Sequence, residues 1–296
     1  MNQLSFKFDL VIPLALKDVF ILKKNIHFIR LNINPSRIYI LTNRKWFSFF
    51  SKDYRQKNGI ILMDENNLLD GLTFNRLKSI MISHFGNANR LYGWYFQQIL
   101  KMAFAKVHHE IHYYLIWDAD TIPTKNLTFF SPMEKIFFNS RIDHNKPYFD
   151  TINRLLNIDV IADYSFITEH MMINSEIMSN LINEISSNII IEGETWYEKI
   201  INAVDINVLH GFSEFETYGT YVLNHYADKY ELRELNTFRD AGRLYGRYIT
   251  QRKIEKEFCN KYDTISLEQW QTPRFPYNIF DYIMKMSFKV ITKIYK

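Results

Sequence analysis

The sequence contains few of the residues that cross-link or interrupt a fold. Its 296 residues include one cysteine, Cys259, which excludes an internal disulfide framework and any zinc site built from several cysteines. Only 9 glycines and 7 prolines are present, which favours long regular elements over a turn-rich β-sandwich.

Long hydrophobic runs are also missing. No stretch approaches the ~18 consecutive apolar residues of a membrane-spanning helix. Residues 1–7 lack the pattern of a secretory signal peptide, so we expect a cytoplasmic protein. The formal net charge of +4 is too weak to indicate nucleic-acid binding, and we expect no nucleic-acid partner.

The remaining composition is that of a globular chain. Apolar residues make up 47% and charged residues 23%, which excludes a mainly disordered protein and leaves room for one large or two closely packed domains.

Short apolar strands alternate with helices along the first third of the chain. We expect strands at residues 8–13, 37–43 and 59–63, with a helix at about 19–30 after the first strand. The next pair is a long uninterrupted helix at 93–107 and an aromatic, β-branched strand directly after it, at 112–117. This order predicts an α/β fold with a Rossmann-like, mostly parallel sheet flanked by helices.

Two acids follow the last of these strands, Asp118 and Asp120. Ligands of open α/β sheets bind at the carboxyl ends of strands, where two uncompensated carboxylates are costly. A Mn²⁺ or Mg²⁺ ion that bridges both acids to a substrate phosphate would remove this cost. The alternative is that the acids only end the strand and cap the turn at 121–123.

Three segments resemble known glycosyltransferases. Residues 114–123, YLIWDADTIP, are similar to the D-x-D segment of GT-A fold enzymes. Residues 93–101, GWYFQQILK, resemble a segment of bacterial capsule and lipopolysaccharide glycosyltransferases. The similarity in element order extends over about residues 8–246, and residues 212–219 are its third specific segment.

This resemblance implies a GT-A fold and a role for each acid. Asp118 and Asp120 would hold Mn²⁺ or Mg²⁺ against the diphosphate of a nucleotide-sugar, expected to be a UDP-sugar, and Asp118 would also approach the donor's ribose or sugar. Gln98 and Lys101 would face the donor, unless they are simply exposed on the helix. Pro13 is assigned to the nucleotide site from its position alone.

Asn43 is assigned to the donor in the same way, because it ends the second predicted strand. The catalytic base is sought at the start of another predicted helix. There, Ser213 and Glu216 have the spacing of a capping box, which leaves Glu214 without a structural task. Inverting GT-A enzymes often place the base at such a helix start, in an x-Glu-Asp type motif whose Asp is missing here. We therefore favour Glu214 as the base of an inverting enzyme, while Glu216 and a retaining mechanism remain alternatives.

Candidates for acceptor binding lie between the metal motif and this helix. Residues 166–172 are expected to form a strand with Glu169 and His170 near its middle, where buried charge needs a partner. Trp196 is a further candidate, because aromatic rings stack on sugar faces.

The expected domain organisation has two parts. Residues 1–250 form a GT-A catalytic domain, with the nucleotide-sugar half at about 1–125 and the acceptor half at 126–250, followed by a C-terminal helical extension at 251–296. The extension ends in an amphipathic helix with lysines at every fourth position, Lys285, Lys289 and Lys293. Such a helix either lies peripherally on an anionic membrane, here the inner face of the cytoplasmic membrane, or docks on the catalytic domain with its lysines outward.

The sequence therefore predicts a metal-dependent glycosyltransferase that moves a sugar from a nucleotide-sugar to a glycan or lipid-linked glycan acceptor, in cell-surface polysaccharide or lipopolysaccharide synthesis. A nucleotidyltransferase acting on sugar phosphates is one alternative, although residues 13–18 lack the glycine-rich loop usual in that class. A non-catalytic glycan-binding protein of the same fold is the other.

Overall fold

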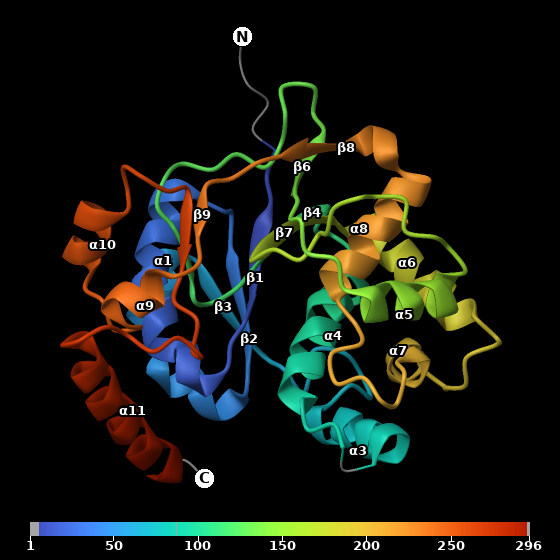
Figure 1. The fold of residues 1–296 in the computed structure, drawn as a ribbon, viewed down its shortest axis with the longest axis horizontal. Helices are drawn as coiled ribbons and strands as arrows, with labels where there is room; N and C mark the ends of the chain where they lie inside the picture. Colours follow the sequence, from blue (N-terminus) through green and yellow to red (C-terminus); the bar gives the residue numbers. More distant parts are fainter. Residues whose placement is uncertain (1–5, 87, 295–296) are drawn as a thin grey trace.

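The computed structural model describes residues 6–86 and 88–294, with side chains described as far as residue 287. Its centre is a five-stranded sheet with the order β3-β2-β1-β4-β7 (Figure 1). The strands are β1 (Asp9–Pro13), β2 (Ile38–Thr42), β3 (Ile60–Asp64), β4 (Tyr113–Trp117) and β7 (His170–Asn174). The first four are parallel, and β7 runs antiparallel to β4. The predicted α/β fold with a mostly parallel sheet flanked by helices is confirmed.

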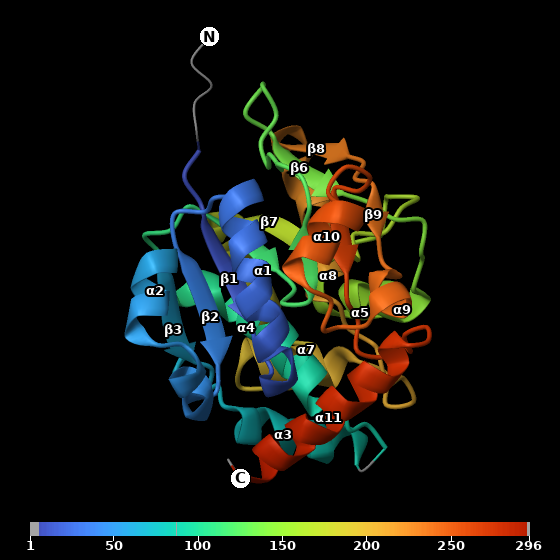
Figure 2. The ribbon, with the colours of Figure 1, turned by 90° about the vertical axis from the view of Figure 1, so that its left-hand side faces the viewer.

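The apolar strands form because both faces of the sheet are covered. Every residue of β1 and β2 is buried, as expected for parallel strands with helices on both sides. Helix α1 (Val19–Asn32) lies on one side of the sheet and α4 (Tyr92–Val107) on the other (Figures 1 and 2). The strands predicted in this region, and both of these helices, are confirmed to within about two residues at each end.

The remaining helices complete the two layers and the edges. They are η1 (Leu16–Asp18), η2 (Arg44–Phe49), α2 (Lys52–Asn58), α3 (Phe74–Phe85), α5 (Lys146–Leu156), α6 (Ser175–Ser187), α7 (Trp196–Ala203), α8 (Glu214–His225), η3 (Ala227–Lys229), α9 (Ala241–Tyr245), α10 (Gln251–Glu257) and α11 (Tyr277–Ile294).

Two small sheets bring the second half of the chain back to the carboxyl end of β4. One has the order β5-β10-β9, formed by β5 (Thr121–Pro123), β10 (Thr264–Ser266) and β9 (Thr237–Phe238). The other pairs β6 (Ile136–Asn139) with β8 (Tyr230–Arg233) in parallel. Since β5 begins one residue after Asp120, the first of these sheets places residues from the C-terminal part of the chain beside the acidic turn.

The strand expected at 166–172 is shifted in the structure. Strand β7 begins at His170, so Glu169 precedes it. The reason is that the partner strand β4 ends at Trp117, which lies opposite His170, and the chain then turns at Asp118, so residues 166–169 lie beyond the end of β4.

The C-terminal extension was expected to be helical, and this is only partly correct. It contains the strand β10, which pairs antiparallel with β5. Ile254, Phe258, Ile265 and Leu267 form a second apolar core with side chains of α1, so much of the extension packs on the rest of the fold. A three-residue strand gives too short a pattern to be predicted from its sequence.

The expected terminal helix is present as α11, and several of its apolar side chains are exposed. Lys285 pairs with Asp281 at 2.7 Å, whereas the side chains of Lys289 and Lys293 lie outside the described residues. Across the described part of the chain, no helix combines the length and the apolar character needed to span a bilayer.

Candidate active site

The acidic turn after β4 lies in a cleft made of two adjoining cavities, of about 310 and 660 Å³. Both are bordered by Asp118 and Asp120, together with Lys17, Trp94, Ile167 and Thr168. We call this space the Asp118–Asp120 cleft. The smaller cavity also borders Pro13, the last residue of β1, so the cleft lies at the carboxyl ends of neighbouring parallel strands. This is the edge where open α/β sheets bind ligands.

A buried lysine connects the acids of the cleft. The ammonium group of Lys101 on α4 lies 3.1 Å from Asp118 Oδ1 and 2.8 Å from Glu214 Oε1. Burial alone would lower the pKa of Lys101, but the two carboxylates outweigh it, and the pKa lies above its usual value. The cleft therefore contains a permanent cation held between two acids from different elements.

Helix α4 aligns these groups through residues three apart. Tyr95, Gln98 and Lys101 are all buried on the same side of the helix. The Tyr95 hydroxyl accepts from the Gly211 backbone at 3.2 Å, and Gln98 Oε1 accepts from the Glu214 backbone N–H at 3.1 Å. These bonds fix the start of α8 against α4. The Gln98 amide nitrogen is buried with no hydrogen-bond partner in the described part of the chain.

Asp120 differs from its neighbour in having no counter-charge in contact. Within residues 6–86 and 88–294, its carboxylate has no hydrogen bond or ion pair, whereas Asp118 contacts Lys101. Burial, followed by the negative charges of Asp118 and Asp18, raises the pKa of Asp120 to about 7. Nearby Asp18 is itself paired with the buried guanidinium of Arg247. The turn thus presents one carboxylate whose charge is not compensated by the protein.

The residues present fit a hard divalent cation that is shared with a ligand. No group of three or more His, Cys, Asp or Glu side chains in the described structure could hold a metal unaided. Mg²⁺ is usually bound by one or two carboxylates together with substrate phosphates, and Mn²⁺ accepts the same oxygen ligands. The free carboxylate of Asp120 and the half-exposed one of Asp118 meet this requirement.

The capping box predicted at α8 is only half formed. Ser213 caps the helix by accepting from the Glu216 backbone N–H at 3.2 Å. The Glu216 side chain does not return to Ser213 but turns into the core, where it accepts from the Ser165 hydroxyl at 2.6 Å and from the Phe166 backbone. Burial raises the pKa of Glu216. Glu216 is therefore not placed as a base for a ligand in the cleft, whereas Glu214 borders the cleft.

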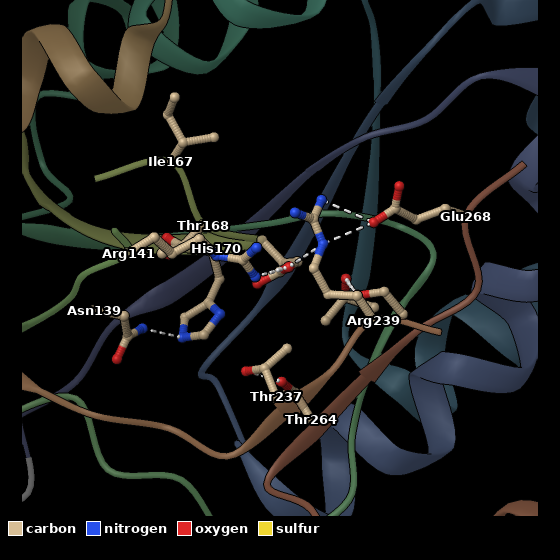
Figure 3. Close-up of polar contacts among 12 residues, drawn as sticks. Asn139, Arg141, Ile167, Thr168, His170, Thr237, Arg239, Thr264 and Glu268 are labelled. Atoms are coloured by element: carbon tan, nitrogen blue, oxygen red, sulfur yellow. Dashed lines mark hydrogen bonds and ion pairs between the residues drawn. The ribbon is translucent and has the colours of Figure 1, made fainter. Parts of the chain in front are cut away.

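The two neighbouring acceptor candidates have different surroundings. Glu169 borders the larger cavity and pairs with both Arg141 and Arg239, the latter at 3.1 Å (Figure 3). His170 is 3% exposed and its ring stacks on Trp117 at 4.6 Å. Burial, reinforced by nearby arginines, lowers the pKa of His170 to about 3, so its imidazole is neutral. Glu169 thus has charged partners, whereas the neutral, buried ring of His170 bonds to the Asn139 amide at 2.7 Å.

Three other candidates are separated by the structure. Pro13 borders the cleft, but Asn43 and Trp196 do not border either of its cavities. Asn43 caps η2 by accepting from the Lys45 backbone at 3.1 Å. Trp196 is 7% exposed and packs in the apolar core as the first residue of α7, which a capping box between Thr195 and Glu198 starts. Neither is placed to touch a ligand in the cleft.

Sequence reasoning missed the far wall of the cleft. Arg239, Glu268 and Trp270 border the larger cavity, and Arg239 pairs with Glu268 at 2.8 Å. Lys17, beside the first strand, was also missed. Trp94 lies within the glycosyltransferase-like segment and could have been inferred from it, but the C-terminal residues carry no local signal.

The chain is similar to several solved glycosyltransferase structures. No curated protein matches it. A galactosyltransferase, LgtC, solved with donor and acceptor sugar analogues, is 10% identical, with 95% of each chain covered and a TM-score of 0.43. Mouse xyloside xylosyltransferase 1 in its apo form is 10% identical over 90% of this chain and 99% of that chain, with a TM-score of 0.44. Core-mannan synthase A from Aspergillus fumigatus, in an Mn/GDP form, is 7% identical over 78% and 74%, with a TM-score of 0.46.

One family profile matches the sequence, and it covers residues 10–251, from the first strand to the start of α10. The match therefore includes the acidic turn, α4 and the start of α8. Since it extends over most of the chain, the protein belongs to the family described as "Family of unknown function (DUF6492)".

Proposed function

We propose that this protein is a metal-dependent glycosyltransferase that moves a sugar from a nucleotide-sugar, expected to be a UDP-sugar, to a hydroxyl group of a glycan acceptor. The observation that carries the proposal is the chain Asp118–Lys101–Glu214 in one cleft, with the uncompensated Asp120 beside it. This set contains acids for a metal, a cation for phosphates and a separate carboxylate for proton transfer.

The donor side is assigned to the smaller cavity. Mn²⁺ or Mg²⁺, when bound by Asp118 and Asp120, would supply Lewis-acid stabilisation of the leaving diphosphate. Lys101 adds a positive charge that titration cannot remove near neutral pH. The unpartnered amide nitrogen of Gln98 is a further hydrogen-bond donor at the same wall. Phosphate oxygens accept from both types of group.

Proton transfer is assigned to Glu214. The acceptor hydroxyl gives its proton to this carboxylate while its oxygen bonds to the anomeric carbon, and the bond from that carbon to the diphosphate breaks. Attack from the face opposite the diphosphate inverts the anomeric configuration. Lys101 pairs with Glu214 at 2.8 Å and so fixes the orientation of this carboxylate, the group that accepts the proton.

The acceptor is assigned to the larger cavity, with its reacting hydroxyl entering the smaller cavity that Glu214 borders. Trp94 and Trp270 supply apolar ring surface there, and Glu169 and Glu268 supply hydrogen-bond acceptors for sugar hydroxyls. An apolar wall with a few converging polar groups is the usual composition of a small-molecule site.

A contact of α11 with an anionic membrane is proposed as the route to a lipid-linked acceptor. Ile279, Ile283 and Met286 lie at helical spacing and are each about half exposed, as are Phe280 and Tyr282. An exposed apolar face on a basic helix is typical of peripheral binding to anionic lipid. Flotation with phosphatidylglycerol vesicles should recover the protein, and Ile283→Asp should reduce that recovery. Equal recovery of both proteins would contradict the contact.

The transferase is tested by a screen of nucleotide-sugars for Mn²⁺-stimulated release of the nucleoside diphosphate. We expect the wild type to turn over one donor, Asp120→Asn to lose the metal-dependent activity, and the exposed control Asp228→Asn to keep it. Release of pyrophosphate from a nucleoside triphosphate and a sugar phosphate would instead indicate a nucleotidyltransferase. Metal-independent turnover in Asp120→Asn would overturn the proposal.

A further inference from the structure

A third cavity, of about 520 Å³, continues from the Asp118–Asp120 cleft on the side away from the metal motif. Thr168, Glu169 and Arg239 border both this cavity and the larger cavity of the cleft. Its other walls come from the loop after β6, from the segment before β7 and from the connection between β8 and β9. We call it the distal cavity. Its volume is within the ~300–1,000 Å³ usual for small-molecule sites.

The boundary between the two cavities is a chain of ion pairs, drawn in Figure 3. Arg141 pairs with Glu169, Glu169 with Arg239 at 3.1 Å, and Arg239 with Glu268 at 2.8 Å. Two guanidinium groups and two carboxylates alternate, so the chain has no net charge. A ligand lying across it would meet N–H donors and carboxylate acceptors in turn, which suits a chain of hydroxyl groups.

The distal cavity itself contains more acid than base. Asp143 and Glu234 are exposed at its wall, and neither has an ion-pair partner among the residues the structure describes. Together with Glu169 they outnumber Arg141 and Arg239, so a phosphate or carboxylate ligand would be repelled. Carboxylates that face no cation are instead good acceptors for neutral hydroxyl groups.

An aromatic side chain adds an apolar surface to the wall of the distal cavity. Tyr164 borders the distal cavity, is half-buried, and has its ring edge-on to Phe166 at 5.4 Å. This contact with the core limits the motion of the ring. Ring surface beside unpaired carboxylates and a neutral ion-pair chain is a wall that matches the apolar faces and hydroxyl edges of a pyranose.

We propose that the distal cavity is a second sugar subsite, which binds an uncharged residue of the acceptor located further along the glycan from the reacting hydroxyl. The acceptor is accordingly a neutral oligosaccharide rather than a monosaccharide, and it lies across Glu169 and Arg239. This inference rests on the proposed function, because it takes the adjoining cleft as the place where the acceptor reacts.

The experiment uses the full chain with UDP and Mn²⁺ present. Neutral gluco-, galacto- and manno-oligosaccharides, from mono- to tetrasaccharides, are titrated and followed by ligand-observed NMR, with hexuronate oligosaccharides as the acidic arm. One neutral series should bind at least about tenfold more tightly as an oligosaccharide than as its monosaccharide, the gain expected for one or two charge-assisted hydrogen bonds.

Two variants locate the binding. Tyr164→Ala and Glu234→Gln should each remove most of this gain without changing UDP–Mn²⁺ binding. Tyr164→Phe, which keeps the ring, and Glu231→Gln, the same change at an exposed residue of β8 outside the cavity, should retain it. Unchanged thermal unfolding of each variant shows that its fold is intact.

The outcomes separate this inference from the proposed function. If UDP–Mn²⁺ binds, three results would overturn the subsite and leave the transferase standing. They are an affinity that does not rise with glycan length, a rise that Tyr164→Ala and Glu234→Gln leave intact, and tighter binding of the acidic series. Glycan binding that depends on Tyr164 and Glu234, but without any nucleotide binding, overturns the transferase and supports a glycan-binding cavity.

Discussion

Replacing Lys101 by methionine tests the electrostatic arrangement of the cleft without any assumption about substrates. Methionine keeps the length and much of the packing of the side chain but removes the charge shared by Asp118 and Glu214. The Glu214 side chain is 5% exposed and the Asp118 side chain 40% exposed. The variant therefore leaves one deeply buried carboxylate and one partly solvated carboxylate without a counter-charge.

The expected loss of unfolding free energy follows from these two exposed fractions. Removing one partner of a buried ion pair destabilises a protein by ~3–5 kcal/mol, and we assign this amount to Glu214. The half-solvated pair with Asp118 adds ~0–1 kcal/mol, because water screens it. Lys101→Met should thus lose ~3–6 kcal/mol of unfolding free energy, a large part of the ~5–15 kcal/mol that is usual for a folded domain.

Urea unfolding followed by tryptophan fluorescence measures this loss. The matched control is Lys106→Met, which makes the same change one turn and a half further along α4, where the lysine donates to Asn183 at the surface. The control should change the stability by less than ~0.5 kcal/mol. Glu214→Gln combined with Lys101→Met should recover much of the loss, because no uncompensated buried charge remains.

The stabilising contribution of Lys101 decreases only at alkaline pH. The pKa of Lys101 is raised above 10.5 by folding, so its stabilising contribution is complete below 10.5 and is lost only as the pH rises through the folded value. The wild type should show no change from this group near neutral pH. Equal stability of the Lys101 and Lys106 variants at pH ~7 would refute the reasoning.

Three further predictions concern the acids and the buried histidine. Glu214→Gln should lower the rate of sugar transfer by ~10²–10⁴-fold at saturating donor and Mn²⁺. Glu216→Gln should keep most of the activity, because its amide oxygen can still accept from Ser165 and Phe166. The reverse order of rates would exchange the roles of the two residues. Folding raises the pKa of Asp120 from 3.8 to about 7, so without metal the stability of the wild type should fall as the pH rises between these values. Asp120→Asn should therefore raise the melting temperature above pH 7. An unchanged or lower melting temperature would contradict this. The His170 ring resonances should not titrate in NMR spectra between pH 4 and 8, since the pKa is about 3, and a midpoint near 6.5 would show that the ring is solvated.

Elements with a local signal were predictable from the sequence. The strands of the central sheet are short runs of buried apolar residues, and α4 is a long uninterrupted helix with Gln98 and Lys101 at one face. The position of Asp118 and Asp120 at a strand end follows from the same pattern. In each of these cases the residues that determine the structure are close together along the chain.

Features that depend on distant partners were not predictable. The role of Glu216 is decided by Ser165, fifty-one residues earlier, which competes with the capping box that the local sequence favours. The wall formed by Arg239 and Glu268 depends on β10 returning to β5, and a strand of three residues gives no periodic signal. Lys101 could be placed on a helix face, but its burial between two acids depends on the packing of α8 against α4.

The central claim is that Asp118 and Asp120 bind a divalent metal together with a nucleotide diphosphate. Titration calorimetry of UDP into the full chain tests this directly, at a pH above the Asp120 pKa of about 7 so that protons do not compete for the carboxylate. We predict that UDP binds in the presence of Mn²⁺, that binding is lost in EDTA, and that Asp120→Asn shows no gain from Mn²⁺ while Asp228→Asn behaves as the wild type. Equal UDP affinity in Mn²⁺ and in EDTA, or a full Mn²⁺ effect in Asp120→Asn, would contradict the account.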